Sequence, residues 1–135
     1  MGEWMANEIG GKGRVLNVEG IPGTSASDSQ NVGIEKALAD FPDVKVKGQI
    51  AGMWTDQVAQ AEVQKWLATN PGKLDGIIIQ SASELGALRA LQQSGRDMIP
   101  ITIGSELGAL CYWRNNPDYV SCLLYTSPSP RDGTK

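Results

Sequence analysis

Five side chains that could stack on a ligand or hydrogen-bond to it fall at the ends of predicted strands, in the loops that follow them, or at the start of a predicted helix. Three of them are Trp54, Gln80 and Glu106, and the other two, Asp28 and Gln30, follow the glycine-rich segment GIPGTS. A tryptophan ring offers a flat apolar surface on which the C–H face of a sugar can stack. Planar carboxylate and amide groups can bind neighbouring hydroxyls through paired donors and acceptors. These residue types therefore indicate a site for a polyhydroxylated ligand.

Each of these residues also has a purely structural interpretation, which stays open at this point. Trp54 could cover the end of a sheet, and Gln80 and Glu106 could simply be polar strand ends. Asp28 and Glu106 could be the carboxylate pair of a glycosidase, but no apolar wall is evident beside either residue, and the acid of such a pair needs one. Cys111 is more typical of a small core residue than of a nucleophile, because the sequence has no His to activate it.

The glycine-rich segments do not match a nucleotide-binding fingerprint. GIPGTSAS at 20–27 contains neither G-x-G-x-x-G nor G-x-x-x-x-G-K-[ST], and GGKG at 10–13 precedes a strand instead of following one. A tight turn whose Thr24 or Ser25 caps the next helix explains the first segment. We therefore expect no nucleotide and no other cofactor.

The composition excludes further classes of function. The 135 residues include no His and only 2 Cys, which excludes the common zinc frameworks and most His-based acid–base catalysis. A net charge of −3 argues against nucleic acid as a partner. No apolar run approaches the roughly 18 to 20 residues of a membrane helix, and the opening MGEWMANEIG lacks the apolar region of a signal peptide. We expect one small globular domain.

The candidate site residues need a scaffold, and the apolar pattern predicts one in which strands and helices alternate. Short apolar runs predict strands at 14–19, 44–50, 76–80 and 101–103. Apolar residues at helical spacing predict helices that include Ile34 to Phe41, Ala59 to Leu67 and Leu85 to Leu91, with shorter helices at 2–9 and about 107–115. This alternation forces parallel strands with right-handed crossovers. The predicted fold class is therefore α/β, with a doubly wound parallel sheet whose strand-to-helix loops meet at one edge. We expect Trp54, Gln80 and Glu106, supported by Asp28 and Gln30, to lie together on a solvent-facing rim at that edge.

Residues that cap or break helices stand at the predicted helix boundaries. Thr24 or Ser25, Thr55, and Ser81 or Ser83 precede the three longer helices. Pro42, the segment 70–72 and Gly95 follow them.

The composition changes after Tyr119, where the last fifteen residues read SCLLYTSPSPRDGTK. Residues 122–132, CLLYTSPSPRD, resemble a translated adapter from sequencing-library preparation, and a disordered tail is the other interpretation. We expect residues 1–121 to form the domain, and residues 122–135 to be an artefactual or disordered tail that packs on nothing.

The order and spacing of these segments resemble the type I periplasmic solute-binding proteins of sugar ABC importers, especially the ribose-binding-like receptors. GKGRVLNVEGIPGTSAS is similar to the strand and loop that open the C-terminal lobe in that family, and LATNPGKLDGIIIQ, LGALRALQQSGR and IPITIGSE follow in the family's order. The resemblance covers residues 2–119. It implies a truncated C-terminal lobe of a two-lobed protein, with the N-terminal lobe and signal peptide missing from this chain.

The resemblance also assigns roles to the candidate residues. Trp54 takes the position of the family's stacking aromatic residue, and Gln80 and Glu106 stand where ribose-binding-like members carry Asn and Asp. Gln30 stands where those members carry an arginine, so the pocket differs in shape and charge. The implied protein is no enzyme: it holds a monosaccharide or a similar solute between two lobes in the periplasm, or as an extracytoplasmic lipoprotein, and delivers it to a membrane permease.

Two other functions remain as alternatives. The same fold resembles the effector-binding domain of LacI-type transcription repressors. A nucleotide-dependent α/β enzyme is disfavoured because both glycine fingerprints fail.

Overall fold

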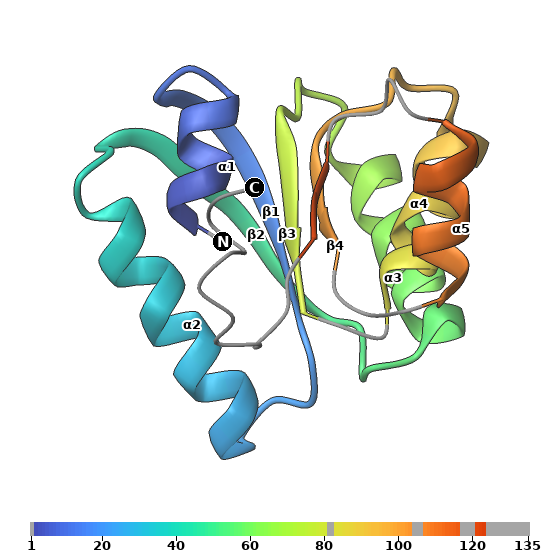
Figure 1. The fold of residues 1–135 in the computed structure, drawn as a ribbon, viewed down its shortest axis with the longest axis horizontal. Coiled ribbons are helices and arrows are strands. Elements are labelled where there is room, and N and C mark those ends of the chain that lie inside the picture. The colour runs from blue at the N-terminus through green and yellow to red at the C-terminus, as the bar shows by residue number, and fades with distance from the viewer. Residues whose placement is uncertain (1, 81–82, 104–106, 117–120, 124–135) are drawn as a thin grey trace.

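Among the residues that the structure describes, five strands form one parallel sheet, and helices alternate with them along the chain (Figure 1). The computed structural model describes residues 2–80, 83–103, 107–116 and 121–123. The strands are β1 (Lys12–Glu19), β2 (Asp43–Ala51), β3 (Gly76–Ile79), β4 (Ile101–Ile103) and β5 (Ser121–Leu123). The helices are α1 (Gly2–Glu8), α2 (Ser25–Leu38), α3 (Asp56–Thr69), α4 (Glu84–Ser94) and α5 (Leu107–Asn115). The strand order is β2-β1-β3-β4-β5 and all pairs are parallel, which confirms the predicted fold class.

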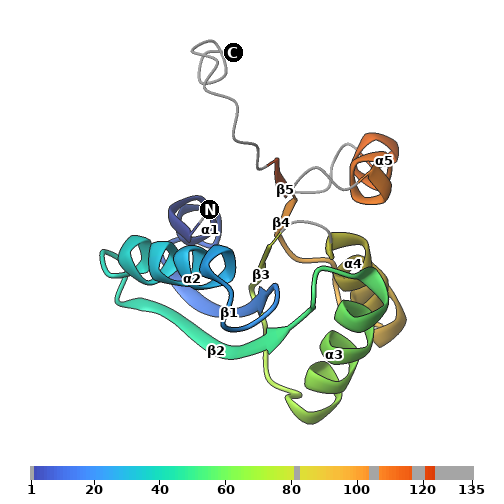
Figure 2. The ribbon, with the colours of Figure 1, turned by 90° about the horizontal axis from the view of Figure 1, so that it is seen from below.

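The helices cover the two faces of the sheet as separate layers. α1 and α2 lie together on one face, and α3, α4 and α5 lie on the other (Figure 2). Residues of β1 alternate between these layers: Val15 packs in the cluster with α1 and α2, and Leu16 and Val18 pack in the cluster with α3 and α4. This alternation follows from the period of two that a strand imposes on its side chains.

The core is built around the central strand β3. Ile77, Ile78 and Ile79 are all fully buried, with Ile78 in the cluster under α1 and α2 and the other two in the cluster under α3 and α4. A strand that is covered on both faces needs such a continuous apolar run. The predicted apolar stripes of the helices are confirmed, because Ile34, Leu38, Ala59, Val63, Leu67, Leu88 and Leu91 are buried.

A β-bulge interrupts the edge strand β2. Val15 pairs with Val46, but the next residue, Leu16, pairs with Gly48, so that Lys47 is an extra residue in β2. A bulge of this kind bends the strand and increases its twist.

The predicted helix boundaries are confirmed at Thr24, Thr55, Ser83 and Gly95. The Thr24 and Thr55 hydroxyls accept hydrogen bonds from the backbone N–H of the third residue of α2 and of α3, at 3.3 and 3.2 Å. α4 follows Ser83 and ends at Gly95, whose φ of 76° is the left-handed value typical of a helix C-terminus. In the described ranges, no helix combines the length and the apolar composition that crossing a membrane requires.

The short strand β5 corrects the predicted end of the fold. Its residues Cys122 and Leu123 pair with Thr102 and Ile103 of β4, so the expectation that the segment from Cys122 onward packs on nothing is wrong for these two residues. Pairing satisfies backbone groups along β4 that would otherwise lack a strand partner on that side. A three-residue strand is too short to produce a readable apolar pattern. Residues 124–135 lie outside the described residues, and the assignment of 1–121 to the domain stays a prediction.

Candidate functional site

The described residues of three of the four predicted strand-to-helix loops lie at the carboxyl edge, the end of the sheet at which its parallel strands finish. They follow β1, β2 and β3 and lead into α2, α3 and α4, at the bottom of Figure 1. The fourth loop contains Glu106, which lies outside the described residues. The carboxyl edge therefore brings together the loops that carry Trp54 and Gln80 and the helix that carries Asp28 and Gln30.

Trp54 is half-buried, and its indole ring lies against the backbone of Gly20 at the end of β1. A Cβ on Gly20 would overlap the indole nitrogen and the adjoining ring carbon, so this close approach requires glycine. The ring does not enter either apolar core cluster. Trp54 thus lies at the carboxyl edge, as the sequence predicts, with its ring packed on Gly20. We call this contact between Trp54 and Gly20 the Trp54 seat.

The backbone at Trp54 is strained. Met53 and Trp54 both have a φ of 56°, in the left-handed region that costs non-glycine residues about 1–2 kcal/mol each. Hydrogen bonds hold this turn in place: Gly52 N–H donates to the Glu19 carbonyl at 2.9 Å, and Met53 N–H donates to the Gly20 carbonyl at 3.3 Å. Strain of this kind concentrates at ligand-binding positions.

Gln80 is almost completely buried, with 1% of its surface exposed. Its Oε1 accepts a hydrogen bond from Gly20 N–H at 3.0 Å. Its Nε2 donates to the carbonyl and hydroxyl oxygens of Ser27, at 3.4 and 3.3 Å. The expectation that Gln80 lies on a solvent-facing rim is therefore wrong, because the loop after β1 and the start of α2 enclose its amide.

A polar cluster, which we call the Glu19 network, continues from Gln80 under α2. Its inner members are buried, whereas Asn31 is half-buried and Gln49 is exposed. Glu19 is 8% exposed, and its carboxylate accepts hydrogen bonds from Ser27 Oγ at 3.3 Å, Asn31 Nδ2 at 2.9 Å and Gln49 Nε2 at 3.2 Å. Asn17 is 3% exposed and donates to Asn31 Oδ1 at 3.0 Å. The members of the Glu19 network are Asn17, Glu19, Ser27, Asn31, Gln49 and Gln80.

Sequence reasoning missed the Glu19 network, although one signal was present. Asn17 and Glu19 are polar residues at alternate positions in the apolar second half of β1, so they point to the same face of the sheet. Buried polar groups need partners. The partners come from α2 and β2, which puts a polar layer between the start of α2 and the sheet, close to the carboxyl edge.

Asp28 and Gln30 lie near the start of α2, immediately after the loop that begins with Gly20. Asp28 is exposed and Gln30 is half-buried. The acidic side chain in the first helical turn is favoured by the positive end of the helix dipole. Both residues belong to the helix that begins at the carboxyl edge, and both side chains are at least partly exposed.

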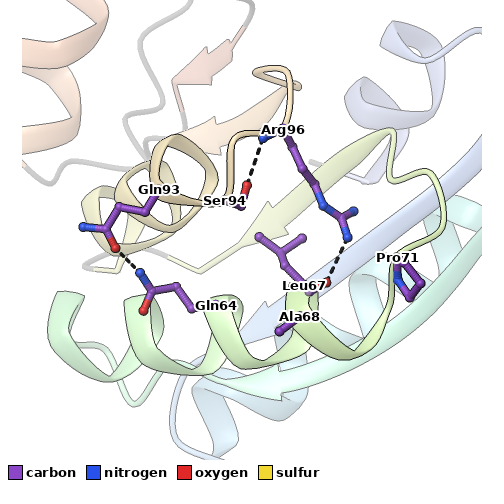
Figure 3. A pocket seen from close by; sticks show the side chains of 7 residues that line it. All are labelled: Gln64, Leu67, Ala68, Pro71, Gln93, Ser94 and Arg96. Atoms are coloured by element: carbon purple, nitrogen blue, oxygen red, sulfur yellow. Dashed lines mark hydrogen bonds between the residues drawn. The ribbon is translucent and has the colours of Figure 1, made fainter.

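A groove of about 470 Å³ lies at the other end of the fold, between the C-terminal ends of α3 and α4 (Figure 3). Arg96 points across it and donates hydrogen bonds to the carbonyls of Leu67 at 2.9 Å and Asn70 at 2.6 Å. The C-terminal ends of these helices lie where strands begin, so this groove is remote from Trp54. The guanidinium group of Arg96 is bound to backbone carbonyls at the C-terminal end of α3.

The described residues offer no metal centre, because they contain no group of three or more His, Cys, Asp or Glu side chains that could hold an ion. Cys111 is a half-buried free thiol on α5. The described part of the carboxyl edge combines the half-buried Trp54 ring with the exposed carboxylate of Asp28.

Two curated proteins resemble this chain along most of its length. A xylitol-binding protein of Mycolicibacterium smegmatis is 33% identical over 100 residues, which are 73% of this chain and 29% of the relative. The ribose import binding protein RbsB of Escherichia coli is 29% identical over 101 residues, which are 74% of this chain and 33% of the relative. The chain thus spans about a third of the length of these relatives.

A solved structure shares the fold at a similar level of identity. It is a periplasmic solute-binding protein of an ABC transporter from Actinobacillus succinogenes with bound D-allose, 26% identical, with a TM-score of 0.75 over 85% of this chain and 41% of that protein. The family described as periplasmic binding protein domain matches residues 1–116. That match covers both helical layers, the Trp54 seat and the Glu19 network, and the chain belongs to the periplasmic binding protein domain family.

Proposed function

We propose that this chain is part of the substrate-binding component of an ABC importer, and that it binds a monosaccharide or a similar polyhydroxylated solute. The observation that carries the proposal is the Trp54 ring, held on Gly20 at the carboxyl edge in a strained turn. Relatives named for xylitol and ribose binding, and a related structure with bound D-allose, support it.

In this proposal the site acts by stacking and by hydrogen bonding. The exposed part of the Trp54 ring receives the C–H face of the solute, an interaction of about 0.5–1.5 kcal/mol beyond the burial of apolar area. Asp28 accepts hydrogen bonds from hydroxyls, and Gln30 can donate and accept. Glu106, beyond the described residues, is the further carboxylate that we propose at this edge. No bond is made or broken in the solute.

Because the chain spans about a third of its relatives, the proposed partners are a second lobe and a membrane permease. A second lobe closes over the solute from the side of the carboxyl edge, and a membrane permease receives the solute from the closed protein. The proposed location is the periplasm, or the outer face of a membrane for a lipoprotein. The relatives support this transport function over the effector-binding domain of a LacI-type repressor, because one is named as an import binding protein and another as a periplasmic solute-binding protein of an ABC transporter.

Saturation-transfer difference NMR tests the proposal on the 135-residue chain, because this method detects the millimolar affinities expected of a partial site. The probes are xylitol, D-ribose and D-allose, with L-leucine as a ligand that lacks hydroxyl groups on its side chain. We expect transfer to the C–H protons of at least one polyol or sugar, loss of this transfer in Trp54→Ala, and none to leucine. Equal transfer in the wild-type chain and Trp54→Ala would refute the proposed site.

A further inference from the structure

Gly20 makes three contacts at the carboxyl edge, one with the end of β3 and two with the loop after β2. Its N–H donates to Gln80 Oε1 at 3.0 Å, and its carbonyl accepts from Met53 N–H at 3.3 Å. The Trp54 indole ring lies against the space where a Cβ would be. The position of Gly20 therefore determines where the Trp54 ring can lie.

Both polar atoms of the Gln80 side chain are hydrogen-bonded within the fold and buried. Its oxygen is bound to Gly20 N–H, both bonds of its nitrogen go to Ser27, and the side chain is 1% exposed. To reach a solute, the amide would have to leave these partners and abandon a buried N–H group. Leaving a buried donor unpaired is costly, which opposes this movement.

We propose that Gln80 is a positioning residue, whose amide oxygen fixes Gly20 and through it the Trp54 ring, and that it does not contact the solute. This inference rests on the proposed function, since it assigns Trp54 the role of the stacking surface. It differs from the role that position alone implies for Gln80, that of a polar group at a strand end which reads hydroxyls.

The nitrogen of the same amide extends the effect to α2. Ser27, which accepts from Gln80 Nε2, also donates from Oγ to Glu19 Oε1 at 3.3 Å. Asp28 follows Ser27 directly in the first turn of α2. One buried amide thus joins the seat of the stacking ring to the start of the helix that carries the proposed hydroxyl-binding carboxylate, and it sets the spacing between the two.

The inference can be tested without a ligand by ¹⁹F NMR of the whole chain labelled with 5-fluorotryptophan. The Trp54 resonance is assigned by its loss in Trp54→Phe. Gln80→Met keeps the size of the side chain but removes the acceptor, so we expect the Trp54 resonance to shift and the Trp66 resonance, which reports on the core, to stay in place. Gln49→Met is the matched control, because it removes an amide of the Glu19 network that does not touch Gly20.

A second variant keeps the test decisive if Gln80→Met does not fold. Gln80→Glu, in its protonated form, retains an oxygen for Gly20 N–H and a donor for Ser27, so it should leave the Trp54 resonance at its wild-type position. An unshifted Trp54 resonance in a folded Gln80→Met chain would overturn the positioning role, as would an equal shift in Gln49→Met or in Gln80→Glu.

The two proposals fail in distinguishable ways. If the ¹⁹F shifts occur as expected but no sugar or polyol binds to the wild-type chain, the positioning role stands and the proposed function is wrong. If a sugar binds through Trp54 and the Trp54 resonance is indifferent to Gln80→Met, the proposed function stands and the positioning role is wrong.

Discussion

The indole ring of Trp66 on α3 lies against the backbone of Gly48, at the bulge of β2, so closely that a Cβ on Gly48 would overlap the ring. Trp54 and Gly20 form a second contact of this kind at the carboxyl edge. The two contacts have different surroundings. Trp66 packs against the larger core cluster, whereas Trp54 lies on a loop. We therefore expect the first pair to determine stability and the second to determine binding.

Gly48→Ala should destabilise the fold by about 1–3 kcal/mol, the usual cost of overpacking, because Trp66 is wedged between α3 and the sheet. Gly33→Ala on α2 is the matched control, since no atom lies within 4 Å of the added Cβ. In a helix interior that change should stabilise by about 0.5–1 kcal/mol. Urea denaturation of both variants measures the two effects, and a Gly48→Ala chain as stable as wild type would contradict the contact.

Gly20→Ala should weaken sugar binding as much as Trp54→Ala does, by about 1–3 kcal/mol. The added Cβ displaces the Trp54 ring from its position, and Trp54→Ala removes the ring altogether. The double variant should lose little more than either single variant, since both act on one interaction. Titration with the sugar that gives the strongest NMR response measures the three affinities. Val32→Ala, an exposed position on α2, serves as the control and should bind normally.

Glu19→Ala should lower the free energy of unfolding by about 1–3 kcal/mol, because it leaves donors of Ser27, Asn31 and Gln49 without their acceptor. Glu35→Ala removes an exposed carboxylate from the same helix layer and should change stability by less than about 0.5 kcal/mol. Chemical denaturation distinguishes the two. Similar losses in both variants would mean that the Glu19 network contributes nothing specific.

Arg96→Met should destabilise the chain by about 1–2 kcal/mol, since the guanidinium group donates to the carbonyls of Leu67, Asn70 and Gly72. Arg96→Lys should recover only part of this loss, because an ammonium group cannot reproduce the planar fork of donors. Arg89→Met, exposed on α4, is the control and should melt at the wild-type temperature. Full recovery by lysine would show that charge alone accounts for the effect.

Two truncations test the boundary between the domain and the predicted tail. Ending the chain after Leu123 should leave the melting temperature unchanged if residues 124–135 are a tail. Ending it after Ser121 removes the β5 residues that pair with Thr102 and Ile103, and should lower the melting temperature by roughly 4 °C or more, the equivalent of about 1 kcal/mol. Identical melting curves for both truncations would show that β5 contributes nothing to stability.

The sequence predicts the layers of this fold well because they depend on local signals. The apolar stripe that includes Val63 and Leu67, and the cap at Thr55, can be read within one or two helical turns. The position of Trp54 at the carboxyl edge follows from the alternation of strands and helices alone. The three-residue strand β5 escapes prediction because it is too short to show a period.

The environment of Gln80 could not be predicted, because its partners are remote in sequence. Gly20 is 60 residues away and Ser27 is 53 residues away, so no local pattern shows that the loop after β1 folds over this amide. The contact between Trp54 and Gly20 could not be predicted for the same reason. From the sequence alone, Gly20 is indistinguishable from an ordinary turn glycine. Position in the chain identifies the edge at which a side chain lies, and packing decides whether it faces solvent.

The bulge in β2 also affects how this chain meets other copies of itself. An exposed edge strand is a template on which a second chain can add a strand and start aggregation. Here the extra residue Lys47 breaks the regular spacing of backbone groups, and Lys45 and Lys47 are both exposed beside the break. A bulge flanked by lysines is a common protection against such growth. The bulge and the two lysines therefore disfavour strand addition at the β2 edge of the sheet.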